Sequence, residues 1–496
     1  MKKIILIILL SINPLLSKSQ ANWSDTAFVH RTGQNIIDGQ GNAINLEGAM
    51  IMGWLMWEGW VWGANGGFTS ETTLYNAVQS KIGTVQANNF RDSVYKNYIT
   101  RSDIQKISTQ CFNAVSIPFN HLLLEDDANP FVYKASGWQI LDSLLQRCED
   151  NNQYVVLSMH SAPGGQSGLF TADPDWPLNL WSSTVNQQRT TELWKAIANR
   201  YKNRGIIAGY DLLNEPDAPS DSALLKMYND IIDSVRTVDV NHMLFIQGKQ
   251  YASDFSLFTS LPDTNMSFCF HFYTWFIPNS SIPIYLNNYG NLSQTMNVPV
   301  WCGEWGENIY STLDTTLKCL KDPAYKIRGE TMCSWKSEWK GSSYPYYCGI
   351  DTAQYWDKSI TWMCNVFAPQ PTVAEMQQGI SDFITNMKFQ NCIFNDTMNA
   401  IVQSCPPIGI EENFVKDAVN VYPNPFSCST TLLTDNLIKN ATLTVYNLQG
   451  QAVKEINNIS GQTIILFRDN LASGLYFIRL TQDNKVIATD KLVITD

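Results

Sequence analysis

The chain has 496 residues, enough for several domains with large buried cores, and a formal net charge of −11. This acidic balance, with no basic stripe, argues against nucleic acid as a partner. Aromatic residues make up 12% of the chain and include 16 Trp, although only 16% of residues are charged. Core packing uses many such rings, but carbohydrate sites use them too, since an aromatic face covers the C–H face of a sugar.

The N-terminus is typical of a signal peptide. Met1-Lys2-Lys3 precedes an apolar run over residues 4–10 and then a stretch with Ser, Asn and Pro. The run is too short to span a bilayer, and no later run reaches transmembrane length. We place the signal peptide at residues 1–19 and expect an exported protein.

Short apolar strands then alternate with amphipathic helices, which predicts an α/β fold, a (β/α)8 TIM barrel over residues 20–405. A hairpin over residues 28–46 precedes the first barrel strand, and we expect it to close the bottom of the barrel. The expected strands cover residues 46–50, 114–119, 154–160, 206–213, 243–247, 267–273, 298–304 and 330–335. The expected helices include residues 102–111, 138–151, 189–202 and 224–237.

An aromatic segment follows the first strand. It carries Trp54, Trp57, Trp60 and Trp62, and a long insertion continues to about residue 98. A loop at this position would lie over the mouth of the barrel, where Trp57 could form a sugar platform. A hydrophobic lid packed only on itself is the alternative.

The C-terminal part changes character after residue 405. Residues 406–418 are expected to form a linker, and residues 419–496 show short alternating strands. Hairpins are expected over 443–456 and 474–494, with turns at 449–451 and 483–484. This spacing predicts a small all-β sandwich domain.

Two barrel strands end in a carboxylate. The apolar run 206–213 leads into Asn214-Glu215-Pro216, and Pro299–Val300 leads into Glu304. Taken alone, Glu215 could equally be a surface residue on a loop. The interval of 89 residues (304 − 215) corresponds to about three strand–helix units of roughly 30 residues, so both carboxylates would face one another across the mouth. Such a pair supplies the proton donor and the nucleophile for cleaving a glycosidic bond.

The cysteines number 11 and form no CxxC pair, so at least one stays outside intrachain disulfides. Cys269, Cys302 and Cys333 each lie two residues before a residue that we place at the mouth. Period-two alternation puts all three on the inward face, one layer down. No His shares that layer, so we interpret them as buried thiols rather than as a metal site.

Six short motifs in order make residues 25–400 resemble glycoside hydrolase family 5. They are Leu46-Glu47-Gly48, the 159–164 segment Met-His-Ser-Ala-Pro-Gly, Leu213-Asn214-Glu215-Pro216, His271-Phe272-Tyr273, Gly303-Glu304-Trp305 and Trp335. The 162–164 loop looks most like the branch of exo-β-1,3-glucanases and related β-glucosidases. Endoglucanases and mannanases share the core motifs.

The resemblance implies a role for each matching residue. Glu215 would be the acid/base and Glu304 the nucleophile of a retaining enzyme without metal or organic cofactor. Asn214 would hold the sugar 2-hydroxyl, while His271 and Tyr273 would orient the two carboxylates. His160 would line the pocket and Trp335 would form its floor. Without the resemblance, each His would be interpreted as a core residue.

One position departs from the family pattern. The family has an Arg in the second strand where this chain has Ser116, so a positive charge beside the nucleophile is missing. We expect a secreted β-glycosidase acting on a β-linked glucan. A catalytically weak or inactive glycan-binding relative and a β-mannanase of the same fold are the alternatives.

The C-terminal domain resembles the type A sorting domain of the type IX secretion system. Its marks are Tyr422-Pro423-Asn424-Pro425, a 445–450 segment and Gly474-Leu475-Tyr476-Phe477. The resemblance implies type IX secretion machinery as a partner and passage through the periplasm and outer membrane, with release or cell-surface attachment. A carbohydrate-binding sandwich is the rival, but these motifs lack exposed aromatics spaced for a glycan.

Overall fold

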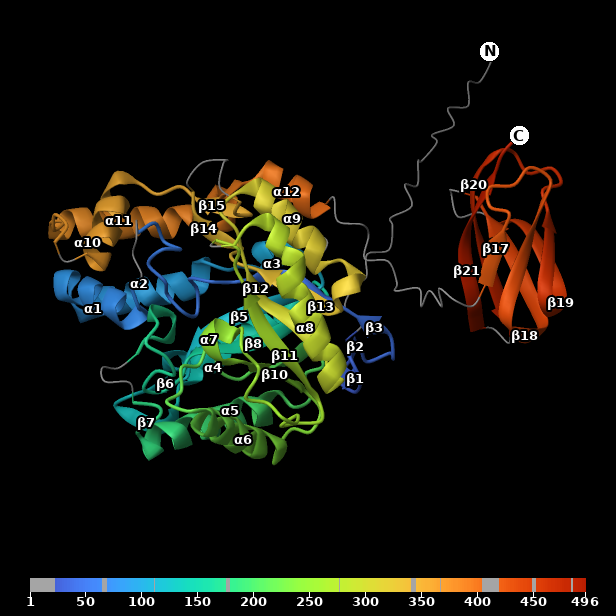
Figure 1. Cartoon of the computed structure of the whole chain (residues 1–496). Helices are drawn as coiled ribbons and strands as arrows, with labels where there is room; N and C mark the ends of the chain where they lie inside the picture. The colour runs from blue at the N-terminus through green and yellow to red at the C-terminus, as the bar shows by residue number, and fades with distance from the viewer. Residues whose placement is uncertain are drawn as a thin grey trace, which may run out of the picture. The chain divides into compact units, whose positions relative to one another are not determined.

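The computed structural model describes residues 23–64, 69–110, 112–174, 179–275, 277–339, 345–365, 367–403, 419–447, 452–482 and 485–496 (Figure 1). The chain divides into two compact units, Met1–Ile408 and Gly409–Asp496, which are described separately. The expected signal peptide, the 406–418 linker and the turns at 449–451 and 483–484 lie outside the described residues.

The first unit is built on a closed barrel of eight parallel strands, as Figure 1 shows, and the predicted (β/α)8 barrel is confirmed. In barrel order the strands are β4 (Leu46–Met50), β5 (Ala114–Asn120), β8 (Tyr154–Ser161), β9 (Ile207–Asp211), β10 (Met243–Gln247), β11 (Met266–Phe272), β12 (Val300–Trp305) and β13 (Ile327–Met332).

Helices cover the barrel strands on the outside. They are α3 (Arg101–Ser108), α4 (Ala135–Glu149), α5 (Thr184–Tyr201), α6 (Asp221–Arg236), α7 (Lys249–Ala252), α8 (Ile282–Met296), α9 (Tyr310–Leu320) and α12 (Asp396–Gln403). Helix α6 shows why these segments are helical. The Ser220 hydroxyl accepts the Ala223 N–H and caps its start, and apolar residues at helical spacing turn one buried face toward the barrel.

The N-terminal segment forms a small antiparallel sheet of β1 (His30–Thr32), β2 (Asn35–Ile37) and β3 (Ala43–Ile44). Val29 and Ile36 are buried in the same cluster as Leu46 and the inward-facing Trp301. The hairpin that we expected therefore packs on the inner residues of the barrel, at the end away from Glu215.

The long insertion after the first strand is helical. Helices α1 (Glu71–Ile82) and α2 (Thr84–Asn97) pack against α10 (Gln354–Cys364) and α11 (Val373–Asn386) beside the barrel (Figure 1). Aromatic rings fill the space between them, and Trp356 stacks on Phe383 with ring centroids 3.9 Å apart. Short strands complete the unit: β6 (Glu125–Asp126), β7 (Asn129–Tyr133), β14 (Lys336–Glu338), β15 (Cys348–Ile350) and β16 (Ile393–Phe394).

One irregularity in β12 determines which residues face inward. Opposite β11, Cys302 pairs with Phe270 but Glu304 pairs with His271, so Gly303 is an extra residue in the ladder. A Cβ at Gly303 would lie 2.2 Å from the Cys269 sulfur, which leaves room only for Gly. The expectation that Cys302 shares the inner layer with Cys269 is wrong, because this bulge reverses the alternation; Cys302 packs in the outer core.

The second unit is all β, as predicted. Its strands are β17 (Val419–Tyr422), β18 (Ser429–Tyr446), β19 (Ala452–Phe467), β20 (Gly474–Gln482) and β21 (Lys485–Ile494), paired antiparallel. The expected hairpins are present, since β18 pairs with β19 around the first turn and β20 with β21 around the second. A separate apolar core, with Leu432, Leu443 and Leu466 fully buried, gives this unit its own stabilisation.

Candidate active site

Glu215 lies four residues beyond the end of β9, in a backbone conformation with φ of 42°. Positive φ is unfavourable for a residue with a Cβ, so the surroundings must hold it. The Gln247 side chain does so, because its Oε1 accepts the Glu215 N–H at 2.7 Å. Pro216 follows and has no N–H to donate. The side chain of Glu215 therefore points over the mouth from a fixed backbone.

Glu304 approaches from β12. One oxygen of Glu215, one nitrogen of His271 and one oxygen of Glu304 all lie within 4.8 Å of one another. The Tyr273 hydroxyl donates to Glu304 Oε1 at 2.5 Å. Both carboxylate side chains are about one-tenth exposed, 12% for Glu215 and 10% for Glu304. The barrel thus brings together two carboxylates that lie 89 residues apart in sequence.

His271 lies between the two carboxylates. Its Nδ1 is 2.7 Å from Glu215 Oε1 and 3.7 Å from Glu304 Oε2. Burial acts to lower the pKa of His271, but the charge of Glu304 and the hydrogen bond to Glu215 outweigh it and raise the pKa to about 9. His271 is therefore a cation at neutral pH.

His160 lies close enough to Glu304 and His271 for their charges to act on it. Burial lowers the pKa of His160 to about 4, so the ring is neutral. Neither of its ring nitrogens has a hydrogen-bond partner among the described residues, and the same holds for the hydroxyl of Ser116. These buried polar atoms are available to a water or to a sugar hydroxyl.

A hydrogen-bonded layer supports the site from below. Gln247 Nε2 donates to Asp211 at 2.8 Å, and Ser158 donates to the same Asp211 oxygen at 2.7 Å. Burial raises the pKa of Asp211 to about 6. Gln247 Nε2 also lies 3.5 Å from Asn214 Oδ1, so one amide orients both members of the Asn214-Glu215 pair.

A second amide ties neighbouring strand ends together. Gln166 Nε2 donates to the carbonyls of His160 at 2.7 Å and of Asn214 at 2.8 Å. The sequence analysis missed both Gln166 and Gln247, because a Gln at a strand end or in a loop carries no distinctive pattern.

Glu58 is a third carboxyl group, close enough to Glu304 and Glu215 for their charges to act on it. It is fully buried, and the Trp60 indole N–H donates to its Oε2 at 2.7 Å. Burial raises the pKa of Glu58 to about 8, and the charges of Glu304 and Glu215 add to this rise. Its Oε1 has no partner in the described part of the chain. Sequence reasoning missed Glu58, although a single charge within the aromatic 54–62 segment was a signal.

The two predicted aromatic platforms lie in different surroundings. Trp57 is 0% exposed and packs against Trp62 and Phe90, with ring centroids 4.8 and 5.4 Å apart. Trp335 follows β13 and donates its indole N–H to Asp103 at 3.1 Å. The structure does not bring Trp57 to the carboxylates, because its ring packs into the helical insertion; the segment reaches the site through Glu58 instead.

Glu215, His271 and Glu304 also form a cluster whose ligand atoms are close enough to surround a metal ion. A His ligand must be neutral to bind a metal, whereas His271, with its pKa raised to about 9, carries a proton at neutral pH. The imidazolium already supplies a positive charge between the two carboxylates. We therefore assign no metal here.

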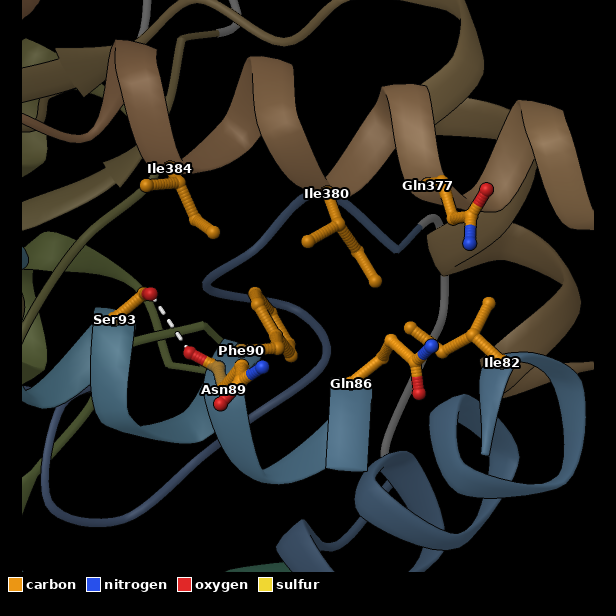
Figure 2. A pocket seen from close by; sticks show the side chains of 8 residues that line it. All are labelled: Ile82, Gln86, Asn89, Phe90, Ser93, Gln377, Ile380 and Ile384. Carbon is orange, nitrogen blue, oxygen red and sulfur yellow. Dashed lines mark hydrogen bonds between the residues drawn. The ribbon is translucent and has the colours of Figure 1, made fainter. Parts of the chain in front are cut away.

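A hollow of about 190 Å³ lies between α1, α2 and α11, and Figure 2 shows the side chains that line it. Ile82, Phe90, Ile380 and Ile384 supply its apolar lining. It contains no carboxylate or His, so it offers no acid or nucleophile for bond cleavage.

Comparison with known proteins matches residues 75–341 to the cellulase family, glycosyl hydrolase family 5. The matched segment covers more than half of the chain. The chain belongs to glycosyl hydrolase family 5. Within this family 5 domain, the site described above lies at the carboxyl ends of the strands, as is usual for a TIM barrel.

Several characterised proteins are similar to this family 5 chain. It is 32% identical over 253 residues to a β-xylosidase of Phanerodontia chrysosporium, covering 50% of this chain and 52% of the relative. It is 30% identical over 189 residues to endoglucanase C of Acetivibrio thermocellus. This match covers 38% of this chain and 54% of the endoglucanase. The chain thus spans about half the length of these relatives. The chain shares its fold with the crystal structure of an endogalactoceramidase, with a TM-score of 0.52 and 14% sequence identity. The match covers 89% of this chain and 100% of the endogalactoceramidase chain.

Residues 420–495 match the secretion system C-terminal sorting domain. The second unit is therefore a type IX sorting domain, which indicates export followed by secretion or attachment to the cell surface. Within the described ranges, no helix is both long and apolar enough to span a membrane.

Proposed function

We propose that this family 5 protein is a retaining β-glycosidase in which Glu215 is the acid/base and Glu304 the nucleophile. The separation of the two carboxylates carries the proposal. Retaining enzymes need carboxyl groups about 5–5.5 Å apart, whereas inverting enzymes hold them at about 6.5–9.5 Å to admit a water. An oxygen of each carboxylate within 4.8 Å of the other supports the retaining arrangement.

In the first step, Glu304 Oε2 attacks C1 of the sugar while Glu215 gives its proton to the departing glycosidic oxygen. The Tyr273 hydroxyl holds Glu304 Oε1, which leaves Oε2 free for this attack. In the second step, Glu215 takes a proton from a water, and the water attacks C1 and releases Glu304. Both steps invert C1, so the product keeps the β configuration.

The family has an Arg at the position of Ser116, and this chain lacks its positive charge. His271 supplies a positive charge in its place. Its pKa, raised to about 9, keeps the ring cationic across the neutral range. It lies 3.7 Å from Glu304 and 2.7 Å from Glu215, so one group stabilises the ionised nucleophile and fixes the acid/base. The absence of that Arg therefore does not imply that the enzyme is slow or inactive.

A β-glucan is the proposed substrate. An endoglucanase is among the similar proteins, which supports this choice. A β-xyloside is the competing substrate, since a β-xylosidase is among the similar proteins. The two sugars differ in the hydroxymethyl group, which only glucose carries.

Proton NMR of the first-formed sugar from laminarin tests the proposal. We expect the β anomer first, followed by slow mutarotation. Release of the α anomer would refute the retaining mechanism. Parallel assays on laminarin, cellulose derivatives, mannan, xylo-oligosaccharides and aryl β-glycosides decide the substrate, and a protein that only binds glycans would turn over none of them.

A further inference from the structure

Two cysteines lie close together beside the segment that carries Trp335. Cys348 begins β15, and Cys392 lies two residues before Phe394, the partner of Cys348 in the antiparallel β15–β16 pair. Cys392 directly precedes β16 in an extended conformation, which places it diagonally across from Cys348. Lys336, the partner of Cys348 in the β14–β15 pair, and Cys392 both contact the Met387 carbonyl, so the two thiols lie close enough to affect one another's ionisation.

The surroundings of this pair favour a reactive thiol. Lys336 is fully buried, pairs with Asp103 at 2.8 Å and donates to the Met387 carbonyl at 3.0 Å. Cys392 Sγ lies 3.5 Å from that same carbonyl. The neighbouring Cys348 thiol and the charge of Lys336 together lower the pKa of Cys392 despite partial burial.

The two thiols differ in access and ionisation. Cys392 is half-buried, whereas Cys348 is buried. Burial raises the pKa of Cys348 well above its ordinary value. A reagent from solvent would therefore meet the more acidic thiol of the pair first. Thiol–disulfide exchange uses such a pair, in which an accessible, more acidic thiol attacks first and a second thiol then displaces the mixed disulfide.

We propose that Cys348 and Cys392 are joined by a disulfide in the exported protein. Exported proteins meet an oxidising environment, in which disulfides form and persist. The inference rests on the sorting domain and on the geometry of the pair, and not on the proposed glycosidase reaction.

The bond forms by exchange with a protein or small-molecule disulfide as the oxidant. The Cys392 thiolate attacks one sulfur of the oxidant, which breaks the S–S bond of the oxidant and releases one thiolate. Cys348 gives its proton to that thiolate and attacks the mixed disulfide at Cys392. The second thiolate departs, so two cysteines are oxidised and one disulfide is reduced to two thiols.

The crosslink would tie two parts of the first unit together at the site. The Cys348 N–H donates to the Trp335 carbonyl at 3.1 Å, and Tyr347 stacks on the Trp335 ring. The Cys392 thiol lies against the carbonyls of Met387 and Lys388, which directly follow the end of α11. The disulfide would hold the end of α11 to the segment that carries Trp335.

Mass spectrometry of the full chain, collected after export and alkylated without reductant, tests the proposal. We expect a crosslinked peptide pair that carries Cys348 and Cys392, two hydrogens lighter than the two thiol peptides. The reduced, folded protein should form the same pair when incubated with oxidised glutathione. Recovery of both residues as alkylated thiols in both experiments would overturn the proposal, and so would either residue in a bridge to another cysteine.

Thermal unfolding separates a bond from mere packing. Cys348→Ser and Cys392→Ser should each lower Tm by several degrees. The double variant should have a Tm no lower than that of the less stable single variant. Reductant should lower Tm of the wild type toward that of the variants and leave the variants unchanged. Cys364→Ser is the control, and it should respond to reductant as the wild type does. A wild-type Tm unaffected by reductant, after reduction has been verified by mass, would overturn the crosslink.

Discussion

Gln247 holds the backbone of Glu215 by accepting its N–H through Oε1 at 2.7 Å. This bond stabilises a positive φ at a residue with a full side chain, and it places the acid/base opposite Glu304. The same amide donates to Asp211, so its orientation is set from the layer below. The position of Glu215, the proposed acid/base, thus depends on the side chain of Gln247.

Replacing Gln247 by Leu should lower kcat by about 10- to 100-fold, since a small displacement of a catalytic group costs that much. The loss should be large for alkyl or sugar leaving groups and small for dinitrophenyl glycosides, which need no proton. Gln247→Glu keeps the acceptor but loses the donation to Asp211, and we expect an intermediate loss. An equal loss for both substrate types would show that Gln247 does not act through Glu215.

The carboxylates themselves should give opposite patterns. Glu304→Ala should abolish turnover of every substrate, by roughly 10⁴-fold or more, because no covalent intermediate can form. Glu215→Ala should lose about 10²- to 10⁴-fold on glucans but keep the first step on dinitrophenyl β-glucosides. Azide should restore turnover of the latter variant by attacking the glycosyl-enzyme. Glu307→Ala, a nearby buried carboxylate outside the pair, is the control and should retain activity on both.

His271 should control the alkaline limb of the pH profile of kcat/KM. The wild type should lose activity as pH rises through about 9, where His271 loses its charge. In His271→Gln the loss of activity that this group causes near pH 9 should disappear.

The stability of the wild type should also depend on the protonation of His271. Its pKa is raised above the ordinary value of 6.5, so its contribution is complete below that pH and is lost as pH rises through about 9. His271→Gln should therefore be destabilised relative to the wild type at pH 6 and less so at pH 10. Parallel unfolding curves at both pH values would contradict this assignment of charge.

Glu58 should destabilise the fold at neutral pH. Its folded pKa of about 8 exceeds the ordinary 4.5, so the unfolded chain releases this proton first and stability falls as pH rises from 4.5 to 8. Glu58→Gln removes the penalty and should raise Tm at pH 8 but not at pH 4. Because Gln keeps an acceptor for Trp60, activity at pH 6 should change by less than about 10-fold. A Tm shift of equal size at both pH values would contradict the elevated pKa.

The catalytic unit should work without the sorting domain. The second unit has its own apolar core, and the residues of the site all belong to the first. A protein of residues 20–410 should therefore keep kcat within about two-fold and unfold in one transition. Folded, soluble protein with a large loss of turnover would show that the second unit contributes to the site.

Local patterns in the sequence were sufficient for the fold and for the closeness of Glu215 and Glu304. Strand–helix alternation predicts a barrel, because each strand and helix must bury one face. Once the strands are placed in the sequence, the residues at their carboxyl ends are known as well. Glu215 before Pro216, and Glu304 among glycines, could therefore be assigned to the mouth. The pairing of Glu215 with Glu304 followed from counting strands, since a closed barrel leaves few arrangements.

Only the tertiary structure decided the electrostatics of the site and the direction of several side chains. One extra residue at Gly303 reverses the alternation in β12, so Cys302 turns outward while Glu304 faces His271. The 54–62 segment turns Trp57 into the helical insertion and Glu58 toward the catalytic pair. Periodicity gives the face of a residue only while the register is regular. The charge of His271 depends on distances to Glu215 and Glu304 that exist only after the barrel closes.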